Sequence, residues 1–470
     1  MKNLRLIYLS SLFLILGCAV EYKPPDLGGL YTKSAMEAHI YSNPVIVIPG
    51  ILGSKLVANK TGQVVWGAFD GGSANPEEPE GARLVALPMK KGAKLSELKN
   101  DVRPDGALDR VKIRLIGLPI TLNAYVNILS ALGAGGYLDD SLHLENIDYG
   151  KEHFTCFQFA YDWRLDNVEN AKRLHEFILE KRAYIQEQYK KLYGIENHLA
   201  KFDIVAHSMG GLITRYYLLY GPADLPEDGS KPEITWEGSK YVDKAIIVAT
   251  PSAGAVDSLD QLVKGKDLGP FLPKYEAAVL GTMPSVYQLM PRTRHKAIVD
   301  ESGAPLDALD FETWKRLGWG LADPEQDRVL AMLLPDVSDP AERRDIALDH
   351  LNKSLTRAKQ FQDSLDISAT PPEGVKQFLM AGDALPTNAV LSINKSTKET
   401  QITGMAPGDG TVTRSSALMD ERIGGEWKPY LVSPVKWTNV MFFFSDHIGL
   451  TQDPAFTDNI LYLLLEKPKS

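Results

Sequence analysis

The chain has 470 residues and a formal net charge of −9 at pH 7. This acidic balance, without a basic stripe, argues against nucleic acid as a partner, because phosphate binding needs clustered lysine and arginine. Its two cysteines are too few for a disulfide framework, and neither a cysteine–histidine zinc spacing nor a glycine-rich phosphate loop is present, so we expect no metal and no cofactor.

The N-terminus has the pattern of an export signal over residues 1–17, where two basic residues precede a short apolar run. This run is too short for a permanent membrane span. The four residues that end at Cys18 resemble the bacterial lipobox, which predicts cleavage after Gly17 and diacylation of Cys18. The alternative is a plain secretory signal in which the cysteine is incidental.

A lipidated Cys18 predicts an exported protein that is lipid-anchored at the cell envelope, because several acyl chains anchor firmly where one would be marginal. Residues 18–43 are then expected to form the lipidated N-terminus and a tether. Ala19 stands where an aspartate would resemble an inner-membrane retention signal, which favours the outer membrane, on its periplasmic or surface face.

The first buried strand is predicted at residues 44–48, a run of β-branched residues that leads into a glycine-rich turn at 49–54. If the protein transfers acyl groups, one of its two oxyanion donors comes from a loop after an early strand. The Ile51 amide is the candidate, because Gly50 and Gly53 let the backbone approach a substrate closely. Taken alone, this loop indicates only a strand-to-helix turn.

Residues 157–164 join a strand to a long amphipathic helical pattern at 168–193. Asp162 and Arg164 are expected to form a structural ion pair beneath a site rather than to catalyse. Cys156 is expected to be a buried packing residue, since no histidine motif surrounds it.

The most informative segment is residues 202–211, where an apolar run ends in small-x-Ser-x-Gly before a helical pattern. This is the layout of a nucleophile elbow, which lifts a serine onto a sharp strand-to-helix turn at the rim of a sheet. Ser208 is the candidate nucleophile and the Met209 amide the second oxyanion donor, although Ala206 replaces the usual first glycine. A further strand is expected at 245–249. The resulting alternation of strands and helices along the chain predicts a mainly parallel sheet covered by helices on both faces.

The strand rhythm disappears between residues 257 and 372, where helical patterns such as 341–365 take over. We therefore expect a helical cap or lid insertion at 257–372, between a first part of the core at 44–256 and a final part at 373–470.

The partners of Ser208 follow from the chain order Ser, acid, His of folds with this elbow. His447, at the end of an apolar run predicted as a strand, is the candidate base. Asp409, in a loop with glycine on both sides, is the candidate acid, and Asp383 is the alternative. Chain order alone leaves the two close, and the loop favours Asp409. Singly, each residue has an ordinary structural explanation.

Five motifs then resemble the lecithin:cholesterol acyltransferase family, which includes the lysosomal phospholipase A type enzymes, and the likeness spans about residues 44–455. Tyr-Asp-Trp-Arg and Gly-Asp-Gly-Thr-Val are the specific ones; the motifs lie at 49–54, 161–164, 206–211, 284–289 and 408–412. The resemblance implies an α/β-hydrolase fold with a helical cap, a catalytic triad of Ser208, Asp409 and His447, and an oxyanion hole of Ile51 and Met209.

The resemblance also implies a serine acyl hydrolase or O-acyltransferase that acts on lipid esters through an acyl-enzyme, with water, an alcohol or a sterol as acceptor. Two departures affect this expectation: the chain cannot form the disulfides of secreted relatives, and Ile51 stands where an acidic residue often follows Pro-Gly. The alternatives are an esterase or amidase with a non-lipid substrate, and a non-catalytic surface lipoprotein with a hydrolase scaffold.

Overall fold

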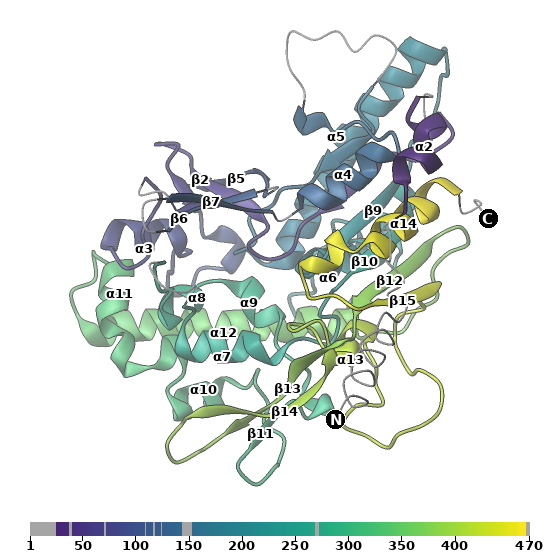
Figure 1. Ribbon diagram of the computed structural model, residues 1–470. Coiled ribbons are helices and arrows are strands. Elements are labelled where there is room, and N and C mark those ends of the chain that lie inside the picture. Colours follow the sequence, from purple (N-terminus) through teal and green to yellow (C-terminus); the bar gives the residue numbers. More distant parts are fainter. Residues whose placement is uncertain are drawn as a thin grey trace, which may run out of the picture.

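The computed structural model describes residues 25–36, 40–69, 72–108, 110–115, 118–123, 125–142, 153–267 and 272–466 (Figure 1). The predicted signal at 1–17 and Cys18 lie outside the described residues. None of the helices in the described ranges is long and apolar enough to cross a membrane.

A six-stranded sheet forms the centre of the molecule, and all of its strand pairs are parallel. Its spatial order is β15 (Asn439–Phe443), β12 (Lys376–Gly382), β10 (Val242–Val248), β9 (Phe202–His207), β1 (Val45–Ile48) and β8 (Cys156–Gln158). The strands predicted from the apolar runs before the glycine-rich turn, before the elbow and after it are confirmed.

Helices cover both faces of this sheet because side chains along a strand point alternately to opposite faces. Ile46 and Ile48 pack with α5 (Asn167–Tyr193) and α6 (Met209–Tyr220). Val45 and Val47 pack on the other face with α4 (Val126–Ala134) and α14 (Pro454–Leu461). The sheet is therefore buried on both sides, as its unbroken apolar strands predict.

The region after β1 differs from the expectation of a strand-to-helix turn. The glycine-rich loop enters β2 (Ser54–Ala58), which pairs with β3 (Val64–Trp66) and β5 (Val102–Ala107). A second small sheet contains β4 (Ala68–Phe69), β6 (Arg110–Leu115) and β7 (Leu118–Asn123), and α3 (Pro79–Val85) lies between β4 and β5 in sequence. These short strands lack the long apolar runs that identify the central ones.

The expected helical region contains its predicted long helix, α12 (Pro340–Leu365), whose N-cap Asp339 accepts a hydrogen bond from the Ala341 amide. The shorter helices of the region are α7 (Val256–Lys264), α8 (Ala277–Leu280), α9 (Pro284–Gln288), α10 (Phe311–Leu317) and α11 (Asp327–Leu333). One strand of this region, β11 (Ile298–Asp300), pairs with β13 (Leu385–Ile393) of the hairpin that β13 makes with β14 (Thr400–Gly408). The division at residue 372 stays a prediction, and a strand from each side of it shares one sheet.

The remaining elements are short. Helix α13 (Arg414–Leu418) follows β14, and a π-helical turn at Tyr462–Glu466 follows α14. Single 3₁₀ turns lie at Leu95–Glu97, Asp140–Leu142, Glu237–Tyr241, Thr293–His295, Gly320–Ala322, Pro324–Gln326 and Gly449–Gln452.

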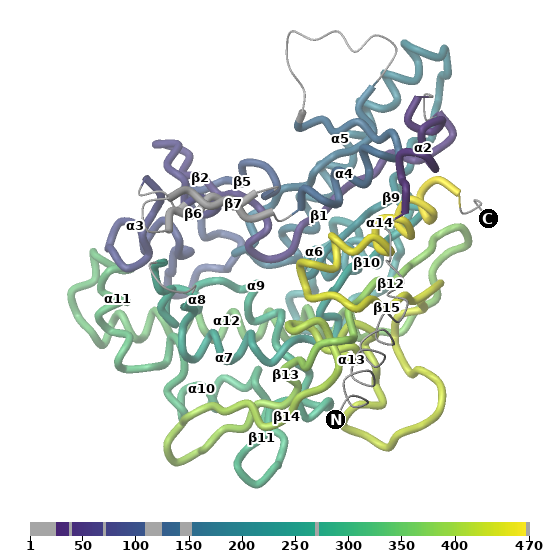
Figure 2. Tube along the Cα trace, viewed as in Figure 1, coloured from purple at the N-terminus to yellow at the C-terminus, as the bar shows by residue number. Residues whose placement is uncertain are grey.

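The expected tether at 18–43 requires a correction, because α2 (Leu27–Met36) is folded against the body of the protein. Tyr31 is buried beside α4 and α14, and its hydroxyl donates to Glu466 at 2.7 Å. The trace in Figure 2 shows this N-terminal helix lying beside the C-terminal one. A tether therefore ends before residue 27.

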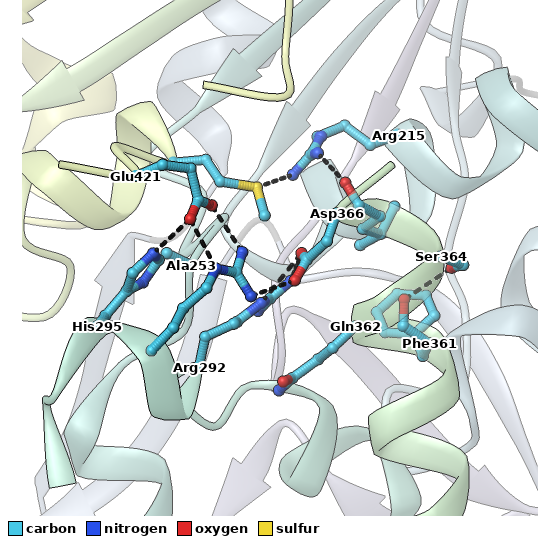
Figure 3. A network of polar contacts seen from close by, with 12 residues as sticks. Arg215, Ala253, Arg292, His295, Phe361, Gln362, Ser364, Asp366 and Glu421 are labelled. Atoms are coloured by element: carbon cyan, nitrogen blue, oxygen red, sulfur yellow. Dashed lines mark hydrogen bonds and ion pairs between the residues drawn. The ribbon is translucent and has the colours of Figure 1, made fainter. Parts of the chain in front are cut away.

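A network of charged side chains, here called the Asp366 network, joins the helical region to the core (Figure 3). Asp366, at the end of α12, accepts from Arg292 at 3.0 Å and from Arg294 at 2.6 Å. Arg294 also pairs with Glu421 at 2.6 Å, and His295 contacts the same carboxylate at 3.2 Å. These side chains connect the segment after α9, the end of α12 and the segment after α13.

Candidate active site

Ser208 lies at a sharp turn between β9 and α6, with φ 52° and ψ −125°, a conformation that residues with a side chain rarely adopt. Hydrogen bonds to the neighbouring strand hold this turn. The Ser208 amide donates to the Val248 carbonyl at 2.8 Å, and the Thr250 hydroxyl donates to the Ser208 carbonyl at 2.8 Å. The predicted elbow geometry is therefore present, with the serine backbone fixed at the edge of the sheet.

The small residues of this segment have steric reasons. A Cβ on Gly210 would lie 2.5 Å from the Pro49 carbonyl oxygen, and one on Gly211 would lie 2.0 Å from the Thr250 hydroxyl. Ala206 sits within β9, fully buried, where its methyl group is accommodated. This explains why alanine can replace the usual first glycine while the two glycines after the serine are required.

The structure brings Ser208, His447 and Asp409 together although 239 residues separate the first pair. The Nε2 atom of His447 lies 3.0 Å from the Ser208 hydroxyl oxygen, and its Nδ1 atom lies 2.8 Å from Asp409 Oδ2. The other carboxylate oxygen of Asp409 accepts from the amides of Thr411 at 2.9 Å and Val412 at 2.6 Å. A carboxylate held in this way accepts from Nδ1–H and leaves Nε2 free to accept the serine proton.

The alternative acid, Asp383, follows β12 and pairs with Arg414. The loop of Asp409 passes close to the same strand, because Gly382 has no side chain: a Cβ there would lie 2.7 Å from the Asp409 Cβ. His447 is not at the end of its strand, as expected from the apolar run, because β15 ends at Phe443 and Phe444 is 88% exposed. The intervening loop carries the imidazole back over the sheet edge.

The loop after β1 approaches the serine closely. A Cβ on Gly50 would lie 2.7 Å from the Ser208 Cβ, so only glycine permits this approach. Within the part of the chain that the structure describes, neither the Ile51 amide nor the Met209 amide donates a hydrogen bond. Both predicted donors thus lie next to the serine and are free for a ligand.

Aromatic side chains brace this loop from outside. The Tyr161 hydroxyl donates to the Pro49 carbonyl at 2.9 Å, and the indole of Trp66 donates to the Leu52 carbonyl at 2.7 Å. The Trp163 indole donates to the Ser54 carbonyl at 3.2 Å. The Tyr-Asp-Trp-Arg segment therefore supports the loop that carries Ile51.

The predicted ion pair between Asp162 and Arg164 is confirmed, with 2.8 Å between the charged atoms and both side chains at most 1% exposed. Arg164 also donates to the carbonyls of Leu84 and Val85, which satisfies the buried guanidinium. The expectation for Cys156 is confirmed too: it is buried, and burial raises the pKa of its thiol, which disfavours the reactive thiolate.

A cavity of about 270 Å³ opens beside Ser208 and His447. Apolar and aromatic side chains predominate in its lining, which includes Ile51, Trp66, Trp163, Leu280, Met283 and Val286. No cluster of side chains suited to hold a metal ion occurs in the described part of the chain. The cavity suits an apolar ligand group whose reactive atom reaches the serine.

Two further residues at the site were missed by sequence reasoning, His207 and Tyr125. His207 is fully buried beside His447, and its ring nitrogens contact the Tyr125 hydroxyl and the His447 carbonyl, each at 3.0 Å. Burial, and then the nearby His447, lowers the pKa of His207 to about 3, so this imidazole is neutral. The only feature of the sequence that could have indicated a role for His207 is its position directly before Ser208.

Comparison with known proteins gives a family match over part of the chain and a fold. Residues 132–315 match the model of the lecithin:cholesterol acyltransferase family, which confirms the resemblance for a segment that contains Ser208 but neither Asp409 nor His447. No curated protein shows a significant sequence match to the chain.

Among solved structures, the Tle4–Tli4 complex contains a chain that is similar at 14% identity with a TM-score of 0.54, covering 89% of this chain and 97% of that one. EstA from Clostridium botulinum matches at 13% identity and TM-score 0.32, covering 95% and 92%. Lipase 1 from Pelosinus fermentans matches at 14% identity and TM-score 0.33, covering 91% and 99%. The first likeness extends over nearly the whole of both chains. The parallel sheet covered on both faces and the elbow at Ser208 are those of the α/β-hydrolase fold, which is the fold of this chain.

Proposed function

We propose that this relative of the lecithin:cholesterol acyltransferase family is a serine acyl hydrolase or O-acyltransferase that acts on lipid esters. The observation that carries the proposal is the continuous path of hydrogen bonds from Ser208 through His447 to Asp409, placed at an apolar cavity. Nucleophile, base and orienting carboxylate have the mutual geometry that acyl transfer requires.

In the first half-reaction, the Ser208 oxygen attacks the ester carbonyl carbon while its proton moves to Nε2 of His447. Asp409 holds the tautomer of the imidazole and stabilises the positive charge that develops on it. The amides of Ile51 and Met209 donate to the oxyanion of the tetrahedral intermediate, where losing one such donor typically costs about 3 kcal/mol of barrier. The C–O bond to the leaving alcohol then breaks, and that alcohol takes the proton from His447.

In the second half-reaction, water or an acceptor alcohol gives its proton to Nε2 of His447 while its oxygen attacks the carbonyl carbon of the acyl-enzyme. The bond from that carbon to the Ser208 oxygen then breaks, and the Ser208 oxygen takes the proton back from His447. Water releases a free fatty acid, whereas an alcohol or a sterol yields a new ester. Every proton and bond in both steps is accounted for by the serine, the imidazole and the two substrates.

The lipid class of the substrate is inferred from the cavity, because an acyl chain buries its apolar surface against the aromatic and aliphatic lining. The lining also carries polar side chains such as Asp257, Gln261 and Lys266, but most of its surface is apolar, so a polar amide or sugar substrate would lose much of its hydration there. Diacylation of Cys18 belongs to the same proposal, since an anchor in the cell envelope would keep the enzyme at its substrate surface.

The test is turnover of phospholipid vesicles by the full-length chain in mild detergent, with and without a sterol or a long-chain alcohol, followed by mass spectrometry. Ser208→Ala is the control, and we expect it to lower turnover by about a million-fold while leaving the unfolding temperature unchanged. Free fatty acid identifies water as acceptor, and a transferred ester identifies the alcohol.

Other outcomes separate the alternatives. If vesicles are untouched but a serine-directed phosphonate labels Ser208, short soluble esters and amides become the substrates to examine. If the phosphonate does not label Ser208 either, the protein is a scaffold and the proposal is wrong.

A further inference from the structure

The loop of Ile51 and the loop of His447 are joined by one buried chain of hydrogen bonds, here called the Gly50–His447 relay. The Gly50 amide donates to the Tyr125 hydroxyl oxygen at 2.8 Å. That hydroxyl lies 3.0 Å from Nδ1 of His207, whose Nε2 lies 3.0 Å from the His447 carbonyl oxygen. Tyr125 is 4% exposed and His207 is 1% exposed, so water does not compete for these bonds.

The direction of each bond follows from the chemistry of the two ends. A carbonyl oxygen only accepts, so Nε2 of His207 must carry the hydrogen. Because the ring is neutral, its Nδ1 is then an acceptor, and the Tyr125 hydroxyl must donate to it. The same hydroxyl accepts from Gly50, and burial keeps its proton in place by raising the pKa of Tyr125. One pattern of protons therefore satisfies every member of the relay.

Packing reinforces the connection at the Gly50 end. A Cβ on Gly53 would lie 2.8 Å from the Tyr125 hydroxyl oxygen, so the glycine-rich loop fits directly onto this phenol. At the other end, the rings of His207 and His447 lie 4.8 Å apart between centroids. His207 is also covalently joined to Ser208, so the relay touches the loop of the oxyanion donor, the nucleophile and the base.

We propose that Tyr125 and His207 are positioning residues, which hold the Ile51 amide and the His447 imidazole at a fixed geometry about Ser208. Neither touches the reacting atoms in this role; they act through the backbone of Gly50 and of His447. The inference deepens the proposed function and rests on it, because the two loops matter jointly only if Ser208 is acylated. A neutral relay suits this task, since it adds no net charge next to an oxyanion and an imidazolium.

The kinetic test removes one atom from the relay. Tyr125→Phe leaves the Gly50 amide without an acceptor and His207 without a donor, while preserving the ring. We expect kcat to fall about 10- to 100-fold with KM changed less than about threefold, because misplacement by a fraction of an ångström affects the transition state more than ground-state binding. Tyr216→Phe is the matched control: it removes another buried hydroxyl, which donates to the Ala223 carbonyl at 3.0 Å away from these loops, and should leave kcat unchanged.

A second variant tests whether the two residues act as one unit. His207→Gln keeps an N–H donor that can reach the His447 carbonyl but offers Tyr125 no ring nitrogen. We expect its kcat to fall as in Tyr125→Phe, and the double variant to fall little further, because both changes break the same chain. Full additivity of the two losses, or an unchanged kcat in Tyr125→Phe, would overturn the relay while the acyl-enzyme mechanism stands.

A spectroscopic measurement on the unaltered protein decides the proton pattern without any turnover. With ¹⁵N-labelled histidine, His207 should give the signals of a neutral imidazole protonated at Nε2 from pH 8 down to pH 5, with the assignment taken from the spectrum of His207→Gln. An Nδ1-protonated ring, or a titration in the ordinary range of histidine, contradicts the relay. If instead the protein neither cleaves lipid nor reacts with the phosphonate, the proposed function fails, whatever the state of His207.

Discussion

The Gly50–His447 relay runs through neutral groups alone, whereas the Asp366 network consists mainly of arginines and carboxylates. Both connect segments that are distant in sequence, and they lie around the same catalytic sheet. Neutral hydrogen bonds are short-ranged and directional, so they fix loops to within a fraction of an ångström. Ion pairs attract over longer distances and tolerate more varied geometry, so they suit the joining of whole elements. We therefore expect substitutions in the Gly50–His447 relay to lower kcat, and substitutions in the Asp366 network to lower the free energy of unfolding.

The largest effect on the catalytic side is expected for Asp409→Asn. An asparagine can hold His447 in the wrong tautomer, and in triads of this kind such a change lowers kcat by about 10⁴-fold. The matched control is Asp383→Asn, which breaks a pair with a half-exposed Arg414 and should leave kcat within about threefold. Steady-state kinetics of both variants checks the assignment, and a larger loss in Asp383→Asn would transfer the acid role to that residue.

In the Asp366 network, Asp366→Asn should lower the stability of the protein and leave kcat nearly unchanged. Removal of this carboxylate leaves Arg292, which is 3% exposed, without its countercharge, and breaking a buried pair in this way costs about 3 kcal/mol of unfolding free energy. Denaturant unfolding measures the loss, and kcat at a temperature where the variant is folded should stay near that of the unaltered protein. A large fall in kcat with unchanged stability would erase the distinction between the two networks.

The last predictions concern the pH dependence of stability, in which buried histidines and a paired carboxylate act in different pH ranges. His207 and His350 are buried, which lowers the pKa of His207 to about 3 and that of His350 to about 4. Below about pH 6.5 the unfolded chain binds protons at these two rings and the folded chain does not. The free energy of unfolding therefore decreases as the pH is lowered, by about 1.4 kcal/mol per pH unit for each histidine, until the pH reaches the pKa of that histidine in the folded protein.

Glu421 behaves as a carboxylate whose charge the fold stabilises. Although burial opposes its ionisation, bonds from Arg294 and His295 lower the pKa of Glu421 to about 2, so its contribution is present above about pH 4.5 and is lost as the pH falls towards 2. Unfolding curves across pH check both windows. Glu421→Gln should flatten the slope only below about pH 4.5, and His350→Gln only between about pH 6.5 and 4; any other pattern contradicts these assignments.

Sequence reasoning reached the parts of the site that local patterns encode. The elbow at Ser208 was readable because a buried strand, small flanking residues and a helix stand next to one another in the chain. Chain order predicted His447 and left Asp409 and Asp383 close, and the glycine-flanked loop favoured Asp409. The structure places Asp409 against His447. The strand end was placed four residues too late at His447, since the apolar run continues through Phe444, one residue beyond the end of the strand at Phe443.

The relay shows what such reasoning lacks. Tyr125 lies at the start of α4, and nothing in its neighbourhood indicates that its hydroxyl meets the amide of Gly50, 75 residues earlier. The two small sheets after β1 were missed for a related reason, because their short strands carry no long apolar run. In both cases the deciding information is a contact between distant segments, which no periodicity records.

The docking of α2 limits how far the folded body can lie from the proposed lipid anchor. Tyr31 and its bond to Glu466 fix the chain to the folded body from Leu27 onwards. If Cys18 carries the proposed lipid, eight residues (19–26) separate the anchor from Leu27, and a fully extended chain over this stretch spans about 30 Å. The proposed active site would then reach only lipids close to its own anchor. It would meet new substrate mainly by lateral diffusion of the whole molecule in the membrane.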